Sequence, residues 1–387
     1  VVFKTYKMND MKGKQGLVCM GLLLVLSSCH TGKQITASGL QRKDFQTEVN
    51  GQHTDLFTLS NKQGMEVCIT NYGARVVSIL VPDRNGKRED VVCGFSTITE
   101  YMEQRQNFGS TVGRYIGRIL NARFTLDGVE YKLVPNNGKS GHISHGGNPG
   151  FADRIWKVEQ ADTHRVRLSY LSPDGENGFP GNLKVTLVYS LGEDDNALDL
   201  TYEATTDAPT VLNLSHHSFF NISGNFTKSV EDQQLWVDAD RFTPYDDKKC
   251  VTGEYLPVAG TPLDFRMPHT IGECIDADHP QLKVVNGYDH TWELNTKGDD
   301  TRPAAWVYDP ASGRKMEIFT TEPGMQIYTG NGLKGKMTGK GGIAYPFRSA
   351  VCFETMHFQD SPNQPGFPST VLRPGEVFRS HTVYKFE

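Results

Sequence analysis

The stretch LKVTLVYSLGEDDNALDLTYEA, residues 183–204, contains two runs in which apolar residues occupy every second position. The runs cover 183–191 and 198–204, and the polar segment 193–196 separates them. Alternation with a period of two is typical of a strand that buries one face, and a polar turn between two such runs indicates a pair of neighbouring strands. We therefore predict two adjacent strands here.

The same signal recurs along most of the chain. Alternating runs cover 165–170 and 377–386, shorter runs flank a turn at 309–313, and Asp127-Gly128 between 124–126 and 129–133 is a strong hairpin signal. The one helical signal is a short turn at 98–104, and no periodic helical stretch exceeds about ten residues. Many strands joined by short turns predict an all-β fold, a sandwich or a barrel.

The N-terminus has the features of an export signal of the lipoprotein type. Lys12 and Lys14 precede an apolar run at 17–26, which ends in Leu-Ser-Ser-Cys at 26–29. A bilayer-spanning helix needs about twenty apolar residues, so we expect no lasting span. We predict a signal peptide at 1–28, lipidation of Cys29, a flexible tether at 29–43 and one domain at 44–387. An ordinary cleaved signal is the alternative.

The lipoprotein-type signal predicts a location outside the cytoplasm, as a periplasmic or outer-membrane-anchored lipoprotein of a bacterium. The chain of 387 residues carries a net charge of −5. It has no basic run that would favour nucleic acid, and no later apolar run that would cross a membrane. Five cysteines remain after the signal without a C-x-x-C spacing, which predicts neither a disulfide framework nor a zinc site: Cys68, Cys93, Cys250, Cys274 and Cys352.

Two adjacent histidines lie in VLNLSHHSFFNISG, residues 211–224, which reads as a further strand. Successive side chains of a strand point to opposite faces, so His216 and His217 cannot chelate one metal ion together. His216 falls on the face of the leucines and His217 on the polar face. We interpret His216 as a core residue and His217 as the candidate for chemistry.

A carboxylate lies among apolar residues in VCFETMHF, residues 351–358. Strict alternation puts Glu354 on one face with Cys352, Met356 and Phe358. Burial raises the pKa of a carboxyl group, so Glu354 is a candidate general acid or base.

Other polar residues fall on predicted loops. Arginines and glycines mix at 111–123, and His142 and His145 form an H-x-x-H spacing that no carboxylate or cysteine completes as a metal site. Asp264 stands two residues before Arg266, as a site residue or as half of a local ion pair. The inventory fits acid–base work on a neutral polyhydroxylated ligand. Sugar isomerisation, sugar binding and glycoside hydrolysis by Glu354 and Asp264 all stay open.

A set of motifs resembles the aldose 1-epimerase (galactose mutarotase) family, in order from about 45 to 387. The motifs are VGRYIGRI (112–119), SHGG (144–147), SPDGENGFPG (172–181), NLSHHSFFNISG (213–224), TPLDFR (261–266), GYDH (287–290), PGMQIYTGN (323–331), FET (353–355) and NQPGFPS (363–369). The resemblance implies a large single-domain β-sandwich with a sugar cleft, an aldohexose substrate, and no cofactor or metal. We expect a monomer.

The resemblance also implies roles for matching residues. Glu354 corresponds to the general base that takes the anomeric proton, and His217 to the general acid at the ring oxygen. Four residues correspond to sugar-binding positions: Arg118, His145, Asp264 and Gln326. Gly117 and His216 depart from the family, which commonly has asparagine at both places.

These roles require His217 to be protonated while Glu354 is ionised. We expect the two charges to support one another as an ion pair. A non-catalytic sugar-binding protein and a hexose-phosphate epimerase on the same scaffold remain as alternatives.

Overall fold

The 183–204 stretch forms the two adjacent strands that its alternation predicts. Strand β14 (Leu183–Leu191) pairs antiparallel with β15 (Ala197–Thr206), with Leu183 opposite Thr206 and Leu191 opposite Leu198. The alternate apolar residues of β14 are all buried, while those between them are exposed or half-buried. One face of this pair therefore belongs to a core.

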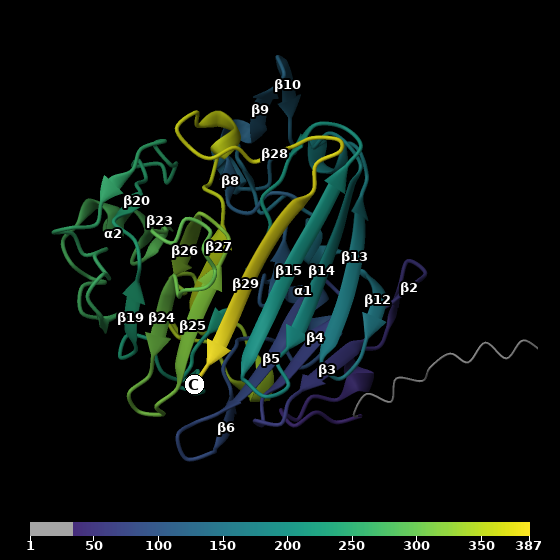
Figure 1. Ribbon diagram of the computed structural model, residues 1–387, viewed down its shortest axis with the longest axis vertical. Coiled ribbons are helices and arrows are strands. Elements are labelled where there is room, and N and C mark those ends of the chain that lie inside the picture. The colour runs from purple at the N-terminus through teal and green to yellow at the C-terminus, as the bar shows by residue number, and fades with distance from the viewer. Residues whose placement is uncertain (1–33) are drawn as a thin grey trace, which may run out of the picture. The chain divides into compact units, whose positions relative to one another are not determined.

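The pair lies within a nine-stranded antiparallel sheet, whose long strands face the viewer in Figure 1. In spatial order the sheet contains β12 (Lys157–Ala161), β13 (Arg165–Ser172), β14, β15, β29 (Phe378–Phe386), β25 (Lys315–Thr320), β24 (Ala305–Tyr308), β19 (Gln234–Val237) and β22 (His269–Thr270).

A second layer covers the buried face of this sheet. It contains a six-stranded sheet of β18 (Phe219–Phe220), β27 (Val351–Met356), β26 (Gly324–Tyr328), β23 (Asp289–Glu293), β20 (Arg241–Thr243) and β21 (Leu256–Pro257). A four-stranded sheet adds β3 (Leu56–Ser60), β4 (Glu66–Thr70), β5 (Arg75–Pro82) and β6 (Arg88–Asp90).

The two layers share one hydrophobic core. Leu187, Leu200 and Ile318 of the nine-stranded sheet belong to the same buried cluster as Ile327 and Phe353 of the six-stranded sheet. Two sheets that bury their facing sides against each other form a β-sandwich. The all-β prediction is confirmed, and the sandwich is the alternative that the structure adopts.

Short elements complete the fold. The two-stranded pairs are β1 (Glu48–Val49) with β2 (Gln52–His53), β7 (Ser110–Val112) with β17 (Ser215–His217), β8 (Arg118–Ile119) with β11 (Ile143–Ser144), β9 (Arg123–Leu126) with β10 (Val129–Lys132), and β16 (Thr210–Val211) with β28 (Val371–Leu372). Within residues 34–387 the α-helices are α1 (Ile98–Gln104) and α2 (Pro280–Val285).

Two local predictions are confirmed closely. Helix α1 spans the predicted 98–104, and Thr97 begins it with a capping box to Glu100. Asp127 and Gly128 connect β9 to β10 with φ values of 51° and 80°, as a tight two-residue hairpin turn requires.

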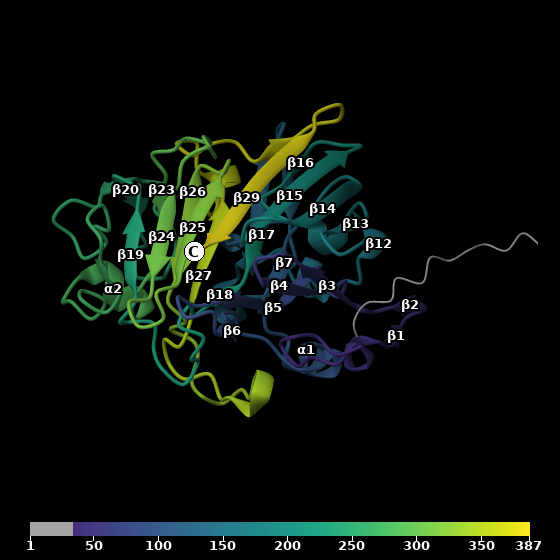
Figure 2. The same cartoon turned by 60° about the horizontal axis from the view of Figure 1, so that its bottom comes forward.

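The 211–224 stretch is not the single strand that its alternation predicts. It forms three short strands, β16, β17 and β18, which pair with β28, β7 and β27 respectively. The alternation of faces persists across the breaks, but each piece has a different neighbour. The stretch therefore connects three separate strand pairings, and the labels β16, β17 and β18 follow one another from the upper right toward the centre of Figure 2.

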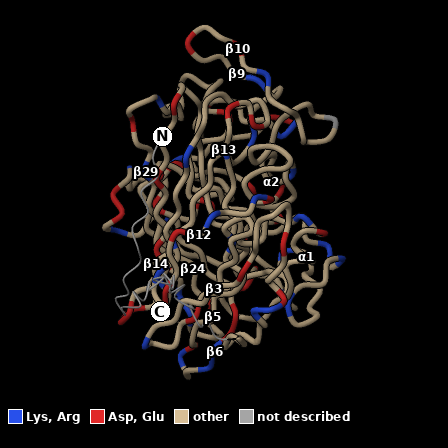
Figure 3. The backbone as a smooth tube through the Cα atoms, turned by 90° about the vertical axis from the view of Figure 1, so that its right-hand side faces the viewer, with Lys and Arg blue, Asp and Glu red and all other residues tan. Residues whose placement is uncertain are grey.

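The structure describes residues 34–387, and these belong to one compact unit. The predicted signal peptide, Cys29 and the start of the predicted tether lie outside the described residues. Among residues 34–387, no helix is both long enough and apolar enough to span a bilayer. Acidic and basic residues are interspersed along the chain in Figure 3.

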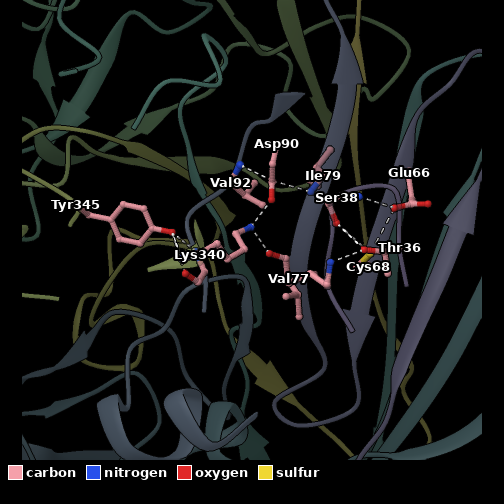
Figure 4. A network of polar contacts seen from close by, with 12 residues as sticks. Thr36, Ser38, Glu66, Cys68, Val77, Ile79, Asp90, Val92, Lys340 and Tyr345 are labelled. Carbon is pink, nitrogen blue, oxygen red and sulfur yellow. Dashed lines mark hydrogen bonds and ion pairs between the residues drawn. The ribbon is translucent and has the colours of Figure 1, made fainter. Parts of the chain in front are cut away.

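The later part of the predicted tether, 34–43, packs against the domain, so the prediction of flexibility is wrong there. The buried Glu66 carboxylate accepts hydrogen bonds from the backbone N–H groups of Ala37 (2.7 Å) and Ser38 (3.3 Å), and Leu40 is buried. Figure 4 shows Glu66 beside Thr36 and Ser38. The hydrogen bonds stabilise a carboxylate that is buried away from water, and the burial of Leu40 removes apolar surface from water. Composition alone does not reveal such partners.

The five cysteines after residue 33 are all free thiols in the structure. Cys68, Cys93 and Cys352 are buried, while Cys250 and Cys274 are half-buried. Their interpretation as apolar core residues is correct for the first three.

Candidate active site

A polar cleft of about 250 Å³ opens on the second layer, where the six-stranded sheet meets β7 and β17. It contains five of the residues that the sequence singled out, namely Arg118, His145, His217, Gln326 and Glu354. It also contains Asn107, Gly117, Phe219, Asp289, Tyr328 and Gln359, among others. Residues more than two hundred positions apart in the sequence thus line one small cavity.

Neighbouring strands supply one wall of the cleft. Glu354 on β27 lies opposite Gln326 on β26, and Gln326 lies opposite Thr291 on β23, which begins at Asp289. Because strand side chains alternate, Phe353 enters the core while Glu354 faces the cleft. The register of three strands therefore brings two carboxylates and an amide to the same wall.

His217 contacts Glu354 directly. The distance from His217 Nε2 to Glu354 Oε1 is 3.3 Å, and only 7% and 5% of the two side chains are exposed. The imidazole stacks on Phe219 at 5.1 Å between ring centroids, and the edge of His145 lies against it at 5.5 Å. The aromatic contacts fix the plane of the His217 ring, and the carboxylate fixes its direction.

Burial shifts both groups toward their neutral forms. Loss of water lowers the pKa of His217 to about 4 and raises the pKa of Glu354 well above its usual value, with the charge of Asp289 adding to the second shift. Burial therefore opposes the expected imidazolium–carboxylate ion pair in the free cleft. The neutral pair, with the proton on Glu354, and the ion pair, with the proton on His217, contain the same number of protons.

His216 lies on the opposite side, in the core. Its Nε2 is 2.6 Å from Ser218 Oγ, and its Nδ1 is 3.4 Å from the Tyr189 hydroxyl. Burial lowers the pKa of His216 to about 3, so this residue is neutral near pH 7. The prediction of a structural histidine is confirmed, and His216 places no titrating group in the cleft.

Gln326 is held in one orientation by its neighbours. Its Oε1 accepts a hydrogen bond from Thr291 Oγ1 at 2.5 Å, and its Nε2 donates to Asp289 Oδ1 at 2.7 Å. His145 Nδ1 accepts a hydrogen bond from the Gly117 backbone N–H at 3.4 Å, and burial lowers the pKa of His145 to about 3, so its ring is neutral near pH 7. These residues present fixed polar groups to a ligand in the cleft.

Asp264 lies outside the cleft, so its predicted contact with a ligand there is wrong. Its carboxylate accepts hydrogen bonds from the Arg266 guanidinium at 2.9 and 2.8 Å, and Arg266 also pairs with Asp240. The local ion pair, which the sequence left as the alternative, is the correct interpretation. A hydrolytic pair of Glu354 and Asp264 is not assembled, because only Glu354 reaches the cleft.

Asp289 is the aspartate that lines the cleft instead. Burial raises its pKa, while Arg118 and the hydrogen bond from Gln326 oppose that shift. Asp289 belongs to the GYDH motif at 287–290, so the signal was present in the sequence. Strand alternation alone could not show whether Asp264 or Asp289 lines the cleft, because both aspartates lie in turn-rich motifs.

Gln359 is a second cleft residue that sequence reasoning missed. Its Nε2 donates to the Tyr245 hydroxyl at 2.7 Å, and its side chain occupies the space beside Gly117. A Cβ atom at position 117 would meet Gln359 Cγ at 2.5 Å. Gly117, with φ of +77°, thus admits the Gln359 side chain to the cleft rather than leaving a gap.

Three ligand atoms that suit a metal ion lie within 4.8 Å of one another in the cleft, on His217, Cys352 and Glu354. However, Cys352 approaches His217 Nδ1 (3.7 Å), whereas Glu354 approaches Nε2 (3.3 Å). The thiol and the carboxylate thus contact different nitrogens of the same ring.

The H-x-x-H pair does not form a metal site. The Asn121 backbone N–H donates to His142 Nδ1 at 2.9 Å, and His142 Nε2 contacts Cys250 Sγ at 3.2 Å, while His145 faces the cleft. The His142 and His145 rings therefore contact different residues.

The sequence and the fold both match known proteins. The family model described as aldose 1-epimerase matches residues 55–385. The chain is 40% identical to the galactose mutarotase of Bos taurus over 85% of this chain and 93% of the relative. It is 36% identical to the aldose 1-epimerase of Escherichia coli over 87% and 96%.

A solved structure supports the same relationship. The crystal structure of an aldose epimerase homologue from C. elegans superimposes with a TM-score of 0.79 at 31% identity, covering 86% of this chain and 99% of that one. The ordered motifs, the sandwich and the relatives agree. The chain belongs to the aldose 1-epimerase family.

Proposed function

We propose that the protein interconverts the α and β anomers of free aldohexoses by general acid–base ring opening and closure. Glu354 is the base and His217 the acid. The observation that carries the proposal is their direct contact, 3.3 Å between Nε2 and Oε1, in a buried cleft lined by hydrogen-bonding side chains. One such proton transfer accelerates a reaction by about 10²–10⁴-fold.

The proton balance of the reaction closes within the pair. Glu354 takes the proton of the anomeric hydroxyl, His217 donates a proton to the ring oxygen, and the C1–O5 bond breaks to give the open aldehyde. Rotation about C1–C2 and reversal of both transfers give the other anomer. Because burial favours the neutral pair, the proton first moves from Glu354 to His217 before the closed sugar reacts, and ring opening returns the neutral pair beside the open-chain sugar.

Arg118, His145, Gln326 and Asp289 hold the sugar in this scheme. All four border the cleft, and Gln326 is already fixed by Thr291 and Asp289. Fixed donors and acceptors lower the entropy lost when the sugar binds, which favours a single orientation of its anomeric centre.

Polarimetry on freshly dissolved α-glucose and α-galactose tests the proposal and measures the preferred sugar. Wild-type protein should speed the approach to equilibrium, and Glu354→Gln should cut turnover by at least about 10²-fold. Glu317→Gln is the matched control, because Glu317 lies on β25 of the nine-stranded sheet, away from the cleft. Near-normal turnover in Glu354→Gln would refute the assigned base.

A non-catalytic sugar-binding protein gives a different result in the same experiment. It would bind hexoses, as measured by calorimetry, without accelerating mutarotation. The buried His217–Glu354 contact favours catalysis, since sugar binding alone does not require two coupled proton-transfer groups.

We also propose export with a lipid anchor at Cys29 and a monomeric state. The first rests on the basic start, the apolar run at 17–26 and the Leu-Ser-Ser-Cys ending. Metabolic labelling with a fatty acid should mark the wild-type protein and not Cys29→Ala. Light scattering after size exclusion tests the monomer.

A further inference from the structure

The side chain of Gln359 connects three walls of the cleft. Gln359 follows β27, Gln326 lies on β26 and Arg118 lies on β8, and all three residues border the cleft. Gln359 Nε2 donates to Gln326 Oε1 at 3.3 Å, and Gln359 Oε1 accepts from the backbone N–H of Arg118 at 3.3 Å. Nε2 also donates to the Tyr245 hydroxyl at 2.7 Å. One amide thus joins two residues that the proposed function assigns to sugar binding.

The backbone at position 117 provides the space that this side chain fills. A Cβ atom on Gly117 would lie 2.5 Å from Gln359 Cγ and 3.1 Å from Gln359 Cδ. Carbon atoms that are not bonded to each other pack at about 3.5–4.0 Å, so a side chain at 117 would displace Gln359. The next residue, Asp360, donates its backbone N–H to the Arg118 carbonyl oxygen at 2.8 Å and holds this segment beside Arg118. The position of the Gln359 amide therefore depends on the glycine.

The partners of this amide decide what it can offer to a ligand. A primary amide has two N–H donors, and Gln359 uses both, toward Tyr245 and Gln326. The amide oxygen has two lone pairs, and the Arg118 N–H takes one of them. Within residues 34–387 the second lone pair of Gln359 Oε1 has no donor. The amide therefore presents one fixed acceptor, which suits the O–H group of a sugar.

The order of the strands indicates which edge of a pyranose meets the amide. β27 lies between β18 and β26, so Glu354 has Gln326 on one side and, on the other, His217, whose ring stacks on Phe219 of β18. With the anomeric hydroxyl at Glu354 and the ring oxygen at His217, C2 and C3 extend toward Gln326, because C1 separates the ring oxygen from C2. Gln359, which is bonded to Gln326, thus faces the edge of the sugar that C2 and C3 form.

We propose that Gln359 determines specificity by accepting a hydrogen bond from a hydroxyl group on the C2–C3 edge of the aldose, and that Gly117 admits it to the cleft. A sugar that lacks the recognised hydroxyl leaves the buried Gln359 oxygen without that partner, which disfavours its reaction. The inference rests on the proposed function, because the roles of His217 and Glu354 set the direction of the sugar.

Anomer exchange of galactose, 2-deoxygalactose and 3-deoxygalactose, followed by proton NMR at equilibrium, tests this contact. For wild-type protein, kcat/KM of one deoxy sugar should lie about tenfold or more below that of galactose. Gln359→Met keeps the bulk and removes the amide. It should lower kcat/KM for galactose by about tenfold and leave that deoxy sugar within about twofold. Gln160→Met, at an exposed position of β12, is the matched control and should keep the wild-type preference.

Gly117→Asn tests the shared space, because asparagine tolerates the positive φ of position 117 (77°). Alone it should displace Gln359 and lower kcat/KM for galactose. Combined with Gln359→Ala it meets no such clash, so its effect should be at least about threefold smaller there. Additive effects of the two substitutions would overturn the role given to Gly117.

Equal losses for all three sugars in Gln359→Met would show a purely structural role and overturn the proposed contact, while the proposed function stands. Equal kcat/KM values of wild-type protein for galactose and both deoxy sugars would overturn it as well. If wild-type protein accelerates the exchange of no sugar, the proposed function fails. Calorimetric binding of the same three sugars to wild-type protein and Gln359→Met then decides on the contact by the same preference.

Discussion

The nine-stranded sheet and the cleft layer are built from the same kind of antiparallel strand in opposite ways. Strands β14 and β15 run nine and ten residues with unbroken register, whereas β17 and β18 have three and two residues and change partners between them. Long regular strands bury one continuous apolar face. Short strands that change partners instead orient single polar side chains toward the cleft.

His216 and His217 show the difference at adjacent positions. Both are buried, and burial lowers the pKa of both. His216 packs toward Tyr189 and Tyr384 of the nine-stranded sheet, while His217 meets Glu354 in the cleft. The same residue type therefore serves stability on one side and chemistry on the other.

The largest expected effect separates these two histidines. His217→Asn should lower turnover by about 10²–10⁴-fold, because the proton donor is lost. His216→Leu should keep turnover within a few-fold and lower the free energy of unfolding by about 1–3 kcal/mol, because Ser218 loses its buried partner. Polarimetry and urea denaturation measure the two effects. Equal losses of turnover in both variants would contradict the division of roles.

A second prediction compares Asp289, which lines the cleft, with Asp264, which lies outside it. Hydrogen bonds to a charged group contribute about 1.5–3 kcal/mol, so Asp289→Asn should lower kcat/KM for galactose roughly 10- to 100-fold. Asp264→Asn should change it little, because Asp264 bonds to Arg266 outside the cleft. The reverse order would return the sugar-binding role to Asp264.

The pH dependence of turnover tests the coupling within the pair. The active pair holds one proton, so turnover falls when a second proton binds and falls again when the pair loses its proton. With the pKa of His217 lowered to about 4 and that of Glu354 raised, the acid limb should lie near pH 4 rather than near the ordinary histidine pKa of about 6.5.

Asp289→Asn provides the matched test of the alkaline limb. The charge of Asp289 contributes to the raised pKa of Glu354, so its removal should move that limb to lower pH. A limb that stays in place would show that Asp289 does not influence Glu354. Values of kcat/KM, which report the pKa values of the free enzyme, are compared by polarimetry across the pH range at galactose concentrations well below KM.

The smallest expected effect lies on the outer face of the nine-stranded sheet. His381 contacts Asp300 at 2.7 Å and Asp199 at 3.1 Å, and the hydrogen bond with Asp199, opposed by desolvation and assisted by Asp300, raises the pKa of His381 to about 8. A raised pKa stabilises the fold fully below the unfolded value of about 6.5, and that stabilisation is lost as pH rises through about 8.

His381→Gln should therefore lower the free energy of unfolding at pH 6 by at most about 1 kcal/mol, since the site is partly exposed, and by less at pH 9. Urea denaturation at both pH values measures the difference, with His53→Gln, on exposed β2, as the control. A pH-independent difference would place the effect in packing rather than in charge.

The sequence predicted the regular parts of the fold better than the cleft. Strands β14 and β15, the Asp127-Gly128 hairpin and helix α1 follow from local pattern, because their signals lie within a few residues. The break of 211–224 into three strands depends on three partners far away in the chain. Local alternation gives the face of each side chain but not the neighbour of each strand.

The cleft was predicted residue by residue with one misplaced aspartate. Glu354, His217, Arg118, His145 and Gln326 meet as the family motifs imply. Asp264 does not, because Arg266 two residues away neutralises it on the surface. Gln359 escaped notice because its entry to the cleft depends on the missing side chain of Gly117, a contact across 242 positions of the chain.

The sequence by itself determined the all-β class, the faces of His216 and His217, and the pair of residues proposed for proton transfer, because alternation and ordered motifs are local properties of the chain. Only the tertiary structure decided which aspartate borders the cleft, that burial opposes the charged forms of His217 and Glu354, and that residues 34–43 pack on the domain. Those outcomes depend on burial, and burial is set by residues distant in the sequence.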